Sequence, residues 1–287
     1  MRYKFLRFPG GKMKAVTLSY DDGVRADLKL AAILDKYGMK CTFNLNSNNI
    51  VNPKNPNKIT PDEIREHILA KGHEIAVHGK YHIAPGIADS VIAIRDVLDC
   101  RLELEAEFDM IVRGMAYPDS GITKIHTGNS YDEIRSYLSS LGIVYSRTLG
   151  GDNNSFMLPS DFYAWMPTAH HINPNLLKWA EEFVEIPTAD LYFTRAYPRL
   201  FYLWGHSYEF DNEHNWDLIE KFCEIMHGRE DTWYATNIEI YDYVKAYESL
   251  ITSADGKTIY NPTLHEVFMA IDGKELSVKS GETVKIQ

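Results

Sequence analysis

Several polar residues stand where a short apolar run of the sequence ends, and their side chains could hold a metal ion or transfer protons. They are Asp21 and Asp22 after VTLSY, His78 and His82 after EIAV, Tyr117 after the Ile111–Ala116 segment, and His206 after LFYLWG. Carboxylates and imidazoles are common ligands of divalent transition metals, and both groups act as general acids and bases. These residues are therefore the candidates for a catalytic or metal site.

The two histidines and the two aspartates carry different kinds of signal. His78 and His82 are four residues apart, a spacing that places two imidazoles on one side of a helical turn. Adjacent carboxylates at a strand end are costly to bury unless a metal or another partner compensates their charge. The alternative interpretations are a solvated helix start for the histidines and a helix N-terminus for the aspartates. One Asp and two His suit Zn²⁺ with an open coordination position, and the same set serves non-haem Fe(II).

Alternating apolar runs and amphipathic stretches predict repeated β-α units, hence an α/β fold with a parallel sheet or barrel. The predicted strands are 15–20, 41–45, 74–77, 111–116, 143–145, 200–205 and 232–235. The predicted helices are 26–37, a helix that opens at Thr60-Pro61, 89–108, one from Ser130 to Gly142, 176–183, 215–226 and 238–250. Residues 148–174 are predicted to form a long loop, because Gly, Asn, Pro and Asp recur there without a period.

The candidate residues all lie at the carboxyl ends of predicted strands. In parallel α/β folds, functional groups gather at the carboxyl ends of the strands, where loops from several units converge. His206 taken alone is more typical of a hydrogen-bonded core residue, but it too follows a predicted strand. We therefore expect these side chains to meet at one face of the sheet.

Composition limits the classes of protein to consider. The 287 residues carry 30 Lys+Arg against 40 Asp+Glu, a net charge of -10, which disfavours binding to nucleic acid or to an acidic membrane. Cys41, Cys100 and Cys223 form no C-x-x-C pair, so neither a disulfide framework nor a thiolate metal site is indicated. No signal peptide or membrane-spanning segment is evident, and we expect a cytoplasmic protein. The oligomeric state is not indicated.

The chain changes character near residue 252. Before it, residues 1–252 are expected to form the main domain, whereas Gly-punctuated, β-prone runs in residues 253–287 predict a small β-hairpin appendage.

At these residues the sequence resembles the polysaccharide deacetylases, the NodB-homology group of metal-dependent carbohydrate esterases. Their T-F-D-D-G motif is matched by Thr17–Gly23 (TLSYDDG), their H-[ST]-x-x-H motif by His78–His82 (HGKYH), and their late leucine-histidine motif by Leu203–His206 (LWGH). The resemblance covers roughly residues 14–250 and implies a distorted, incomplete (β/α) barrel.

The resemblance also implies roles for the candidate residues. Asp22, His78 and His82 would hold Zn²⁺ or another divalent transition metal, Asp21 would be the general base and His206 the general acid. Residues expected at the substrate are Arg113, Tyr117, Trp165 and Trp204.

Three motifs depart from the family pattern. Gly79 stands where the family has a hydroxyl that braces the histidine loop. Either Arg113 or Tyr117 takes the place of the arginine that orients the base, and Asp161 with Trp165 are only loose counterparts of the pair that braces the acid histidine.

The function expected from the resemblance is hydrolytic removal of N- or O-linked acetyl groups from a carbohydrate. The alternatives are a C–N hydrolase of a non-sugar amide on the same scaffold and a carbohydrate-binding relative without turnover. An Fe(II) oxygenase is a weaker alternative, because its ligand set usually accompanies an all-β barrel.

Overall fold

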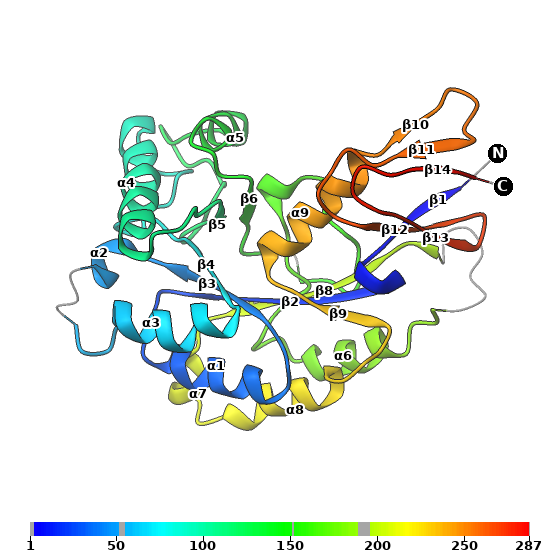
Figure 1. The fold of residues 1–287 in the computed structure, drawn as a ribbon. Helices are drawn as coiled ribbons and strands as arrows, with labels where there is room; N and C mark the ends of the chain where they lie inside the picture. The colour runs from blue at the N-terminus through cyan, green and yellow to red at the C-terminus, as the bar shows by residue number, and fades with distance from the viewer. Residues whose placement is uncertain (1–2, 52–54, 151, 189–195, 287) are drawn as a thin grey trace.

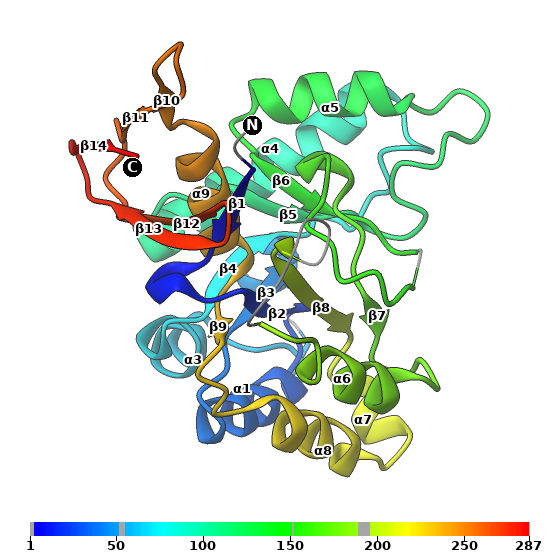
Figure 2. The same ribbon diagram turned by 90° about the vertical axis from the view of Figure 1, so that its right-hand side faces the viewer.

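The computed structural model describes residues 3–51, 55–150, 152–188 and 196–286, and its centre is a curled parallel sheet (Figure 1). In these residues the sheet has eight strands, with β9 paired to β2 beside the order β6-β5-β4-β3-β2-β8-β7. All of its strand pairs are parallel. Helices surround the sheet, which curls into a half-barrel (Figure 2). The predicted incomplete (β/α) barrel is confirmed.

The central strands form because short apolar runs are buried on both faces, as in other parallel sheets. All eight residues of β2 (Lys14–Asp21) are buried, and so are all those of β3 (Cys41–Leu45) and β4 (Glu74–Val77). The other strands of the sheet are β5 (Gly114–Ala116), β6 (Tyr145–Arg147), β7 (Ala169–His170), β8 (Arg199–Gly205) and β9 (Thr232–Tyr234).

Two predictions about this sheet need correction. The strand predicted over 143–145 begins at Tyr145, because the backbone N–H of Ile143 instead donates to Leu138 O and closes the end of a helix. The predicted loop 148–174 contains β7 and a 3-10 helix at Phe162–Ala164. β7 is a strand because it pairs with β8, and a strand of two residues leaves too little local pattern to be predicted from the sequence.

The α-helices in the described residues are α1 (Ala26–Lys36), α2 (Ser47–Ile50), α3 (Pro61–His67), α4 (Ser90–Phe108), α5 (Tyr131–Ser140), α6 (Leu176–Val184), α7 (Tyr208–Asn212), α8 (Trp216–Met226) and α9 (Asn237–Glu248). Seven of them lie close to the predicted ranges, whereas the short helices α2 and α7 were not predicted. The predicted caps at Thr60 and Ser130 are confirmed, and each forms a capping box with a glutamate three residues later. Within the described ranges, no helix is both long and apolar enough to cross a bilayer.

Two small antiparallel sheets lie beside α9 (Figures 1 and 2). One joins β1 (Lys4–Arg7), β12 (Val267–Ile271) and β13 (Lys274–Val278), and the other joins β10 (Ile251–Thr252), β11 (Thr258–Tyr260) and β14 (Thr283–Lys285). The boundary predicted near residue 252 thus falls between β10 and its partner β11. Strand β1, from the other end of the chain, also belongs to these sheets.

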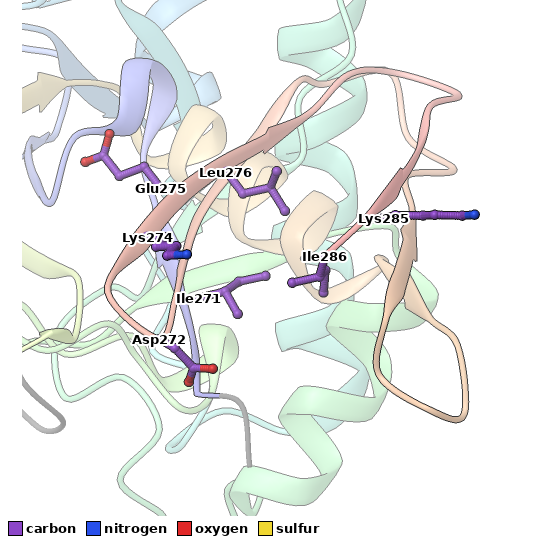
Figure 3. Close-up of a pocket in the computed structure, with 7 residues that line it drawn as sticks. All are labelled: Ile271, Asp272, Lys274, Glu275, Leu276, Lys285 and Ile286. Carbon is purple, nitrogen blue, oxygen red and sulfur yellow. The ribbon is translucent and has the colours of Figure 1, made fainter.

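A cavity of 360 Å³ lies between the β12–β13 hairpin and β14 (Figure 3). Its apolar lining comes from Ile271, Leu276 and Ile286. The remaining lining residues are charged and belong to the same C-terminal segment. This cavity includes none of the candidate site residues.

Candidate metal centre

The parallel register brings the candidate residues to one level of the sheet. Asp21 at the end of β2 is paired with Asn44 of β3, and Asn44 is paired with Ala76 of β4, two residues before His78. On the other side of β2, Tyr20 is paired with Gly205, directly before His206. The carboxyl ends of β2, β4 and β8 therefore present Asp21, His78 and His206 on one face.

Asp22, His78 and His82, here called the triad, lie close enough together to share one cation. One ligand atom from each residue lies within 4.8 Å of the others. Asp22 Oδ1 is 3.8 Å from His78 Nε2 and 3.8 Å from His82 Nε2. Two imidazoles and one carboxylate are a ligand set of catalytic transition-metal sites, in which a further position is left for water or substrate.

His78 is already in the form that a metal ligand requires. Its Nδ1–H donates to the carbonyl oxygen of Ala116 at 2.9 Å, because a carbonyl can only accept, and the lone pair on Nε2 therefore faces the triad. Burial lowers the pKa of His78 and favours the neutral ring. Nε2 is buried and makes no hydrogen bond to any described residue. A buried nitrogen in this position fits a bound cation.

Strained backbone positions present the other two triad residues. Asp22 has φ +80° and His82 has φ +60°, values that are uncommon for residues other than glycine. Asp22 is held by two hydrogen bonds, from its own N–H to Asn44 O at 3.0 Å and from Lys58 Nζ to its carbonyl at 2.8 Å. Conformations of this kind persist where the surroundings over-determine them, commonly at functional sites.

The histidine loop is braced by Asp96 of α4. The Asp96 carboxylate accepts hydrogen bonds from the backbone N–H of Tyr81 at 2.7 Å and of Ile83 at 3.3 Å. A Cβ atom added at Gly79 would lie 2.2 Å from Asp96 Oδ2, and Gly79 has φ +76°. A buried carboxylate thus braces the loop at a position where a side chain on residue 79 does not fit.

Asp21 lies in a fully buried polar cluster behind the triad. Its Oδ2 atom accepts a hydrogen bond from Arg147 Nη2, and its Oδ1 atom accepts one from Asn44 Nδ2 at 2.7 Å. The Arg147 guanidinium also stacks on the Trp204 ring, 4.2 Å from the ring centroid. Although burial alone would raise it, the charge of Arg147 holds the pKa of Asp21 below its usual value.

Arg147 was not among the residues expected at the site. It is the last residue of β6, so it lies at the carboxyl end of a strand, as the other candidates do. It was missed because this strand ends two residues later than predicted. Of the two residues considered for the arginine that orients the base, neither contacts Asp21. Arg113 binds Asp242 of α9 at 3.0 and 2.6 Å from the opposite, amino end of β5.

His206 faces Asp21 with one nitrogen and Glu209 with the other. His206 Nε2 is 3.9 Å from Asp21 Oδ2, and Nδ1 is 3.5 Å from Glu209 Oε2. Burial alone would lower the pKa of His206, but Glu209 and Asp21 together raise it. Glu209 was also not expected, whereas Asp161 instead accepts hydrogen bonds from Tyr131 and Tyr163.

Three aromatic residues expected at the substrate are largely enclosed. Tyr117 is buried, and its hydroxyl donates to Tyr163 O at 2.8 Å. Trp165 is 1% exposed and packs against other aromatic rings, and Trp204 is 6% exposed beneath Arg147. Tyr208, which is 36% exposed and lies 5.3 Å from His206 between ring centroids, is the more accessible aromatic side chain here.

Part of the sequence is similar to a known protein family. Residues 8–145 match the family model described as polysaccharide deacetylase, a range that includes Asp21 and the triad but not Arg147 or His206. No curated protein sequence matches the chain.

Two solved structures share the fold. A protein from Mycobacterium smegmatis, provisionally assigned as a polysaccharide deacetylase, is similar with a TM-score of 0.58 and 18% identity over 85% of this chain and 94% of its own. The chitin deacetylase of the fungal pathogen Colletotrichum lindemuthianum has a TM-score of 0.50 and 16% identity, over 78% of this chain and 86% of its own. Residues 8–145 are thus similar in sequence to the polysaccharide deacetylases, and the half-barrel fold is shared with these two structures.

Proposed function

We propose that this protein is a metal-dependent hydrolase that removes N- or O-linked acetyl groups from a carbohydrate. The observation that carries the proposal is the Nε2 atom of His78. It is buried, it faces the carboxylate of Asp22, and it has no hydrogen-bond partner among the described residues. The match of residues 8–145 to the polysaccharide deacetylase family model supports the reaction class.

Asp22, His78 and His82 would hold the ion, and Zn²⁺ fits their two nitrogens and one oxygen. When bound, a divalent ion supplies Lewis-acid chemistry, because it polarises an acetyl carbonyl and lowers the pKa of water to about 7. The exposed side of His82, 34% accessible, leaves room for substrate to approach.

Asp21 would accept the proton of the attacking water. The charge of Arg147 keeps this carboxylate ionised, and Asn44 fixes its orientation. Its Oδ2 atom lies 3.8 Å from His78 Nε2, close to the position where the reaction would occur. A base held next to the metal ligand is within reach of the proton that it must take.

His206 would donate a proton to the departing amine or alkoxide through Nε2. Glu209 on its Nδ1 side supports the protonated ring. Asp21 Oδ2 lies 3.8 Å from His78 Nε2 and 3.9 Å from His206 Nε2, so a proton acceptor and a proton donor both stand beside the triad.

The test is acetate release from N-acetylated and O-acetylated oligosaccharides, before chelation, after chelation and after zinc is restored. We expect activity to disappear and return with the metal. Asp22→Asn should lose both the metal and the activity, whereas Asp62→Asn, at a carboxylate that is 97% exposed, should lose neither. An Asp22→Asn protein that keeps stoichiometric metal and full turnover would contradict the proposal.

The same assay separates the alternatives. Acetate released from simple amides but not from saccharides would identify a C–N hydrolase of another substrate class. Saccharide binding without acetate release would identify a binding protein.

A further inference from the structure

Three histidines and a glutamate converge beside His206, outside the triad. Glu209 Oε2 lies 3.4 Å from His170 Nε2, 3.5 Å from His206 Nδ1 and 3.1 Å from His171 Nε2. Ligand atoms of His170, His206 and Glu209 all lie within 4.8 Å of one another. They belong to the carboxyl end of β7 and to the junction of β8 with α7.

Hydrogen bonds to Glu209 Oε2 account for only part of this convergence. Glu209 Oε2 already accepts the backbone N–H of His206 at 3.2 Å, and a carboxylate oxygen offers about two lone pairs. Among the described residues, His206 Nδ1 and both ring nitrogens of His171 are buried without a hydrogen-bond partner. His171 is 1% exposed, and its Nε2 points at the same oxygen. Several unpaired ring nitrogens facing one carboxylate oxygen are the arrangement expected when these atoms are ligands of one cation.

We propose that His170, His206 and Glu209 form a second site for a divalent transition-metal ion, and that this site inhibits the protein when it is filled. Two histidines and one glutamate are a recognised zinc ligand set. Bonds of about 2.0–2.2 Å place tetrahedral ligand atoms about 3.3–3.6 Å apart. The two carboxylate–imidazole distances, 3.4 and 3.5 Å, meet this requirement, and all three ligand atoms lie within 4.8 Å of one another.

The second site binds its ion more weakly than the triad. The N–H of Ile172 donates to His170 Nδ1 at 3.2 Å, so that Nδ1 carries a lone pair and Nε2 carries the proton. A metal on Nε2 requires the proton to move to Nδ1, and this breaks the bond from Ile172. His78 of the triad needs no such change, because its Nδ1 already donates to Ala116. The second ion therefore binds only when the metal is in excess.

Inhibition rests on the proposed function, in which His206 is the acid. A His206 ring whose Nδ1 lone pair is held by a cation cannot form the imidazolium ion that donates the proton. General acid catalysis contributes roughly 100-fold or more, so turnover with the second site filled should fall on the order of 100-fold. The binding of the ion itself does not depend on the reaction.

The test counts zinc ions bound to the full chain by equilibrium dialysis, and uses the visible spectrum of Co²⁺ to report coordination. We expect two ions in the unchanged protein, the second one weaker. Asp22→Asn should retain only the weaker ion, and His170→Gln should retain only the tighter one. His67→Gln, on the exposed surface of α3, should still bind both and serves as the control for surface histidines.

A single bound ion at tenfold excess of zinc over protein would overturn the proposal, as would a second ion that persists in His170→Gln. Loss of both ions from Asp22→Asn would also overturn it, because the second site would then not be independent. If Asp22→Asn instead keeps the tighter ion, the triad assignment fails while the second site stands.

In the activity assay, excess zinc should inhibit the unchanged protein and His67→Gln but not His170→Gln. Equal inhibition of all three would contradict the inhibitory role.

Discussion

The carboxylate of Asp96 occupies the space that a side chain on Gly79 would need. Its Oδ2 atom would lie 2.2 Å from a Cβ atom at position 79, and the same carboxylate holds the histidine loop through two backbone N–H groups. The glycine and the aspartate therefore work as a pair. The hydroxyl that the family pattern leads one to expect at position 79 is replaced by a brace from α4.

This pairing predicts that Gly79→Ser damages the metal centre. The new side chain collides with Asp96 at a residue with φ +76°, and crowding plus backbone strain should cost about 2–4 kcal/mol. Urea unfolding and zinc affinity measure the effect.

Asp96→Ala leaves two N–H groups unpaired and should cost about 1–3 kcal/mol. Asp99→Ala, one turn along α4, is the matched control. The double variant Gly79→Ser/Asp96→Ala should lose less stability than the sum of the losses in the two single variants. Strict additivity would refute the pairing.

Replacement of Arg147 should change how stability depends on pH. In the unchanged protein Arg147 keeps the pKa of Asp21 low, so this carboxylate stabilises the fold above its ordinary pKa and loses that contribution as the pH falls. In Arg147→Gln the largest opposing charge is gone, so burial raises the pKa of Asp21, and the contribution of Asp21 to stability should decline as the pH rises from about 4 upward. The uncompensated charge should cost about 3–5 kcal/mol at neutral pH.

Thermal unfolding from pH 4 to pH 8 measures this change. Arg113→Gln is the control, because Arg113 pairs with Asp242 in a partly exposed position and should shift stability by less than about 1 kcal/mol. Parallel pH profiles of Arg147→Gln and the unchanged protein would show that Arg147 does not neutralise Asp21.

Glu209→Gln should impair the acid step selectively. The neutral amide no longer supports the protonated ring of His206, so turnover of an N-acetyl or alkyl acetate substrate should fall about 10–100-fold. An aryl acetate should be much less affected, because a phenolate leaves without a proton. The kcat values of both substrates measure the difference, and Glu213→Gln, exposed just beyond α7, is the control. Equal losses on the two substrates would indicate a merely structural role.

The strand ends could be predicted, whereas the contacts behind them could not. Asp21, His78 and His206 each follow an apolar run, and that local pattern suffices to place them on one face of a parallel sheet. Arg147 and Glu209 act through tertiary contacts. Arg147 reaches Asp21 across the sheet, and Glu209 reaches His206 from the short helix α7, which leaves little periodic signal.

The same distinction applies to the small sheets. Turn residues such as Asp272-Gly273 marked the β12–β13 hairpin, but the antiparallel pairing of β1 with β12 joins opposite ends of the chain. No local pattern reports such a pairing, because the register depends on which edge strand is available.

Glu74 should make the fold less stable as the pH rises towards neutrality. This buried carboxyl, which faces Thr42, Tyr145 and the N–H of Ile238, has a pKa that burial raises to about 7. Because that pKa lies above the ordinary value, the unfolded chain loses the proton first, and stability declines between about pH 4 and pH 7 by up to about 3 kcal/mol. Glu74→Gln imitates the protonated acid and should remove this part of the decline. Free energies of unfolding at pH 5 and pH 8, for the unchanged protein and for Glu74→Gln, measure this contribution. If the stability of the variant falls as steeply as that of the unchanged protein, the decline belongs to other groups. Asp27 is one such group, because burial also raises its pKa to about 7.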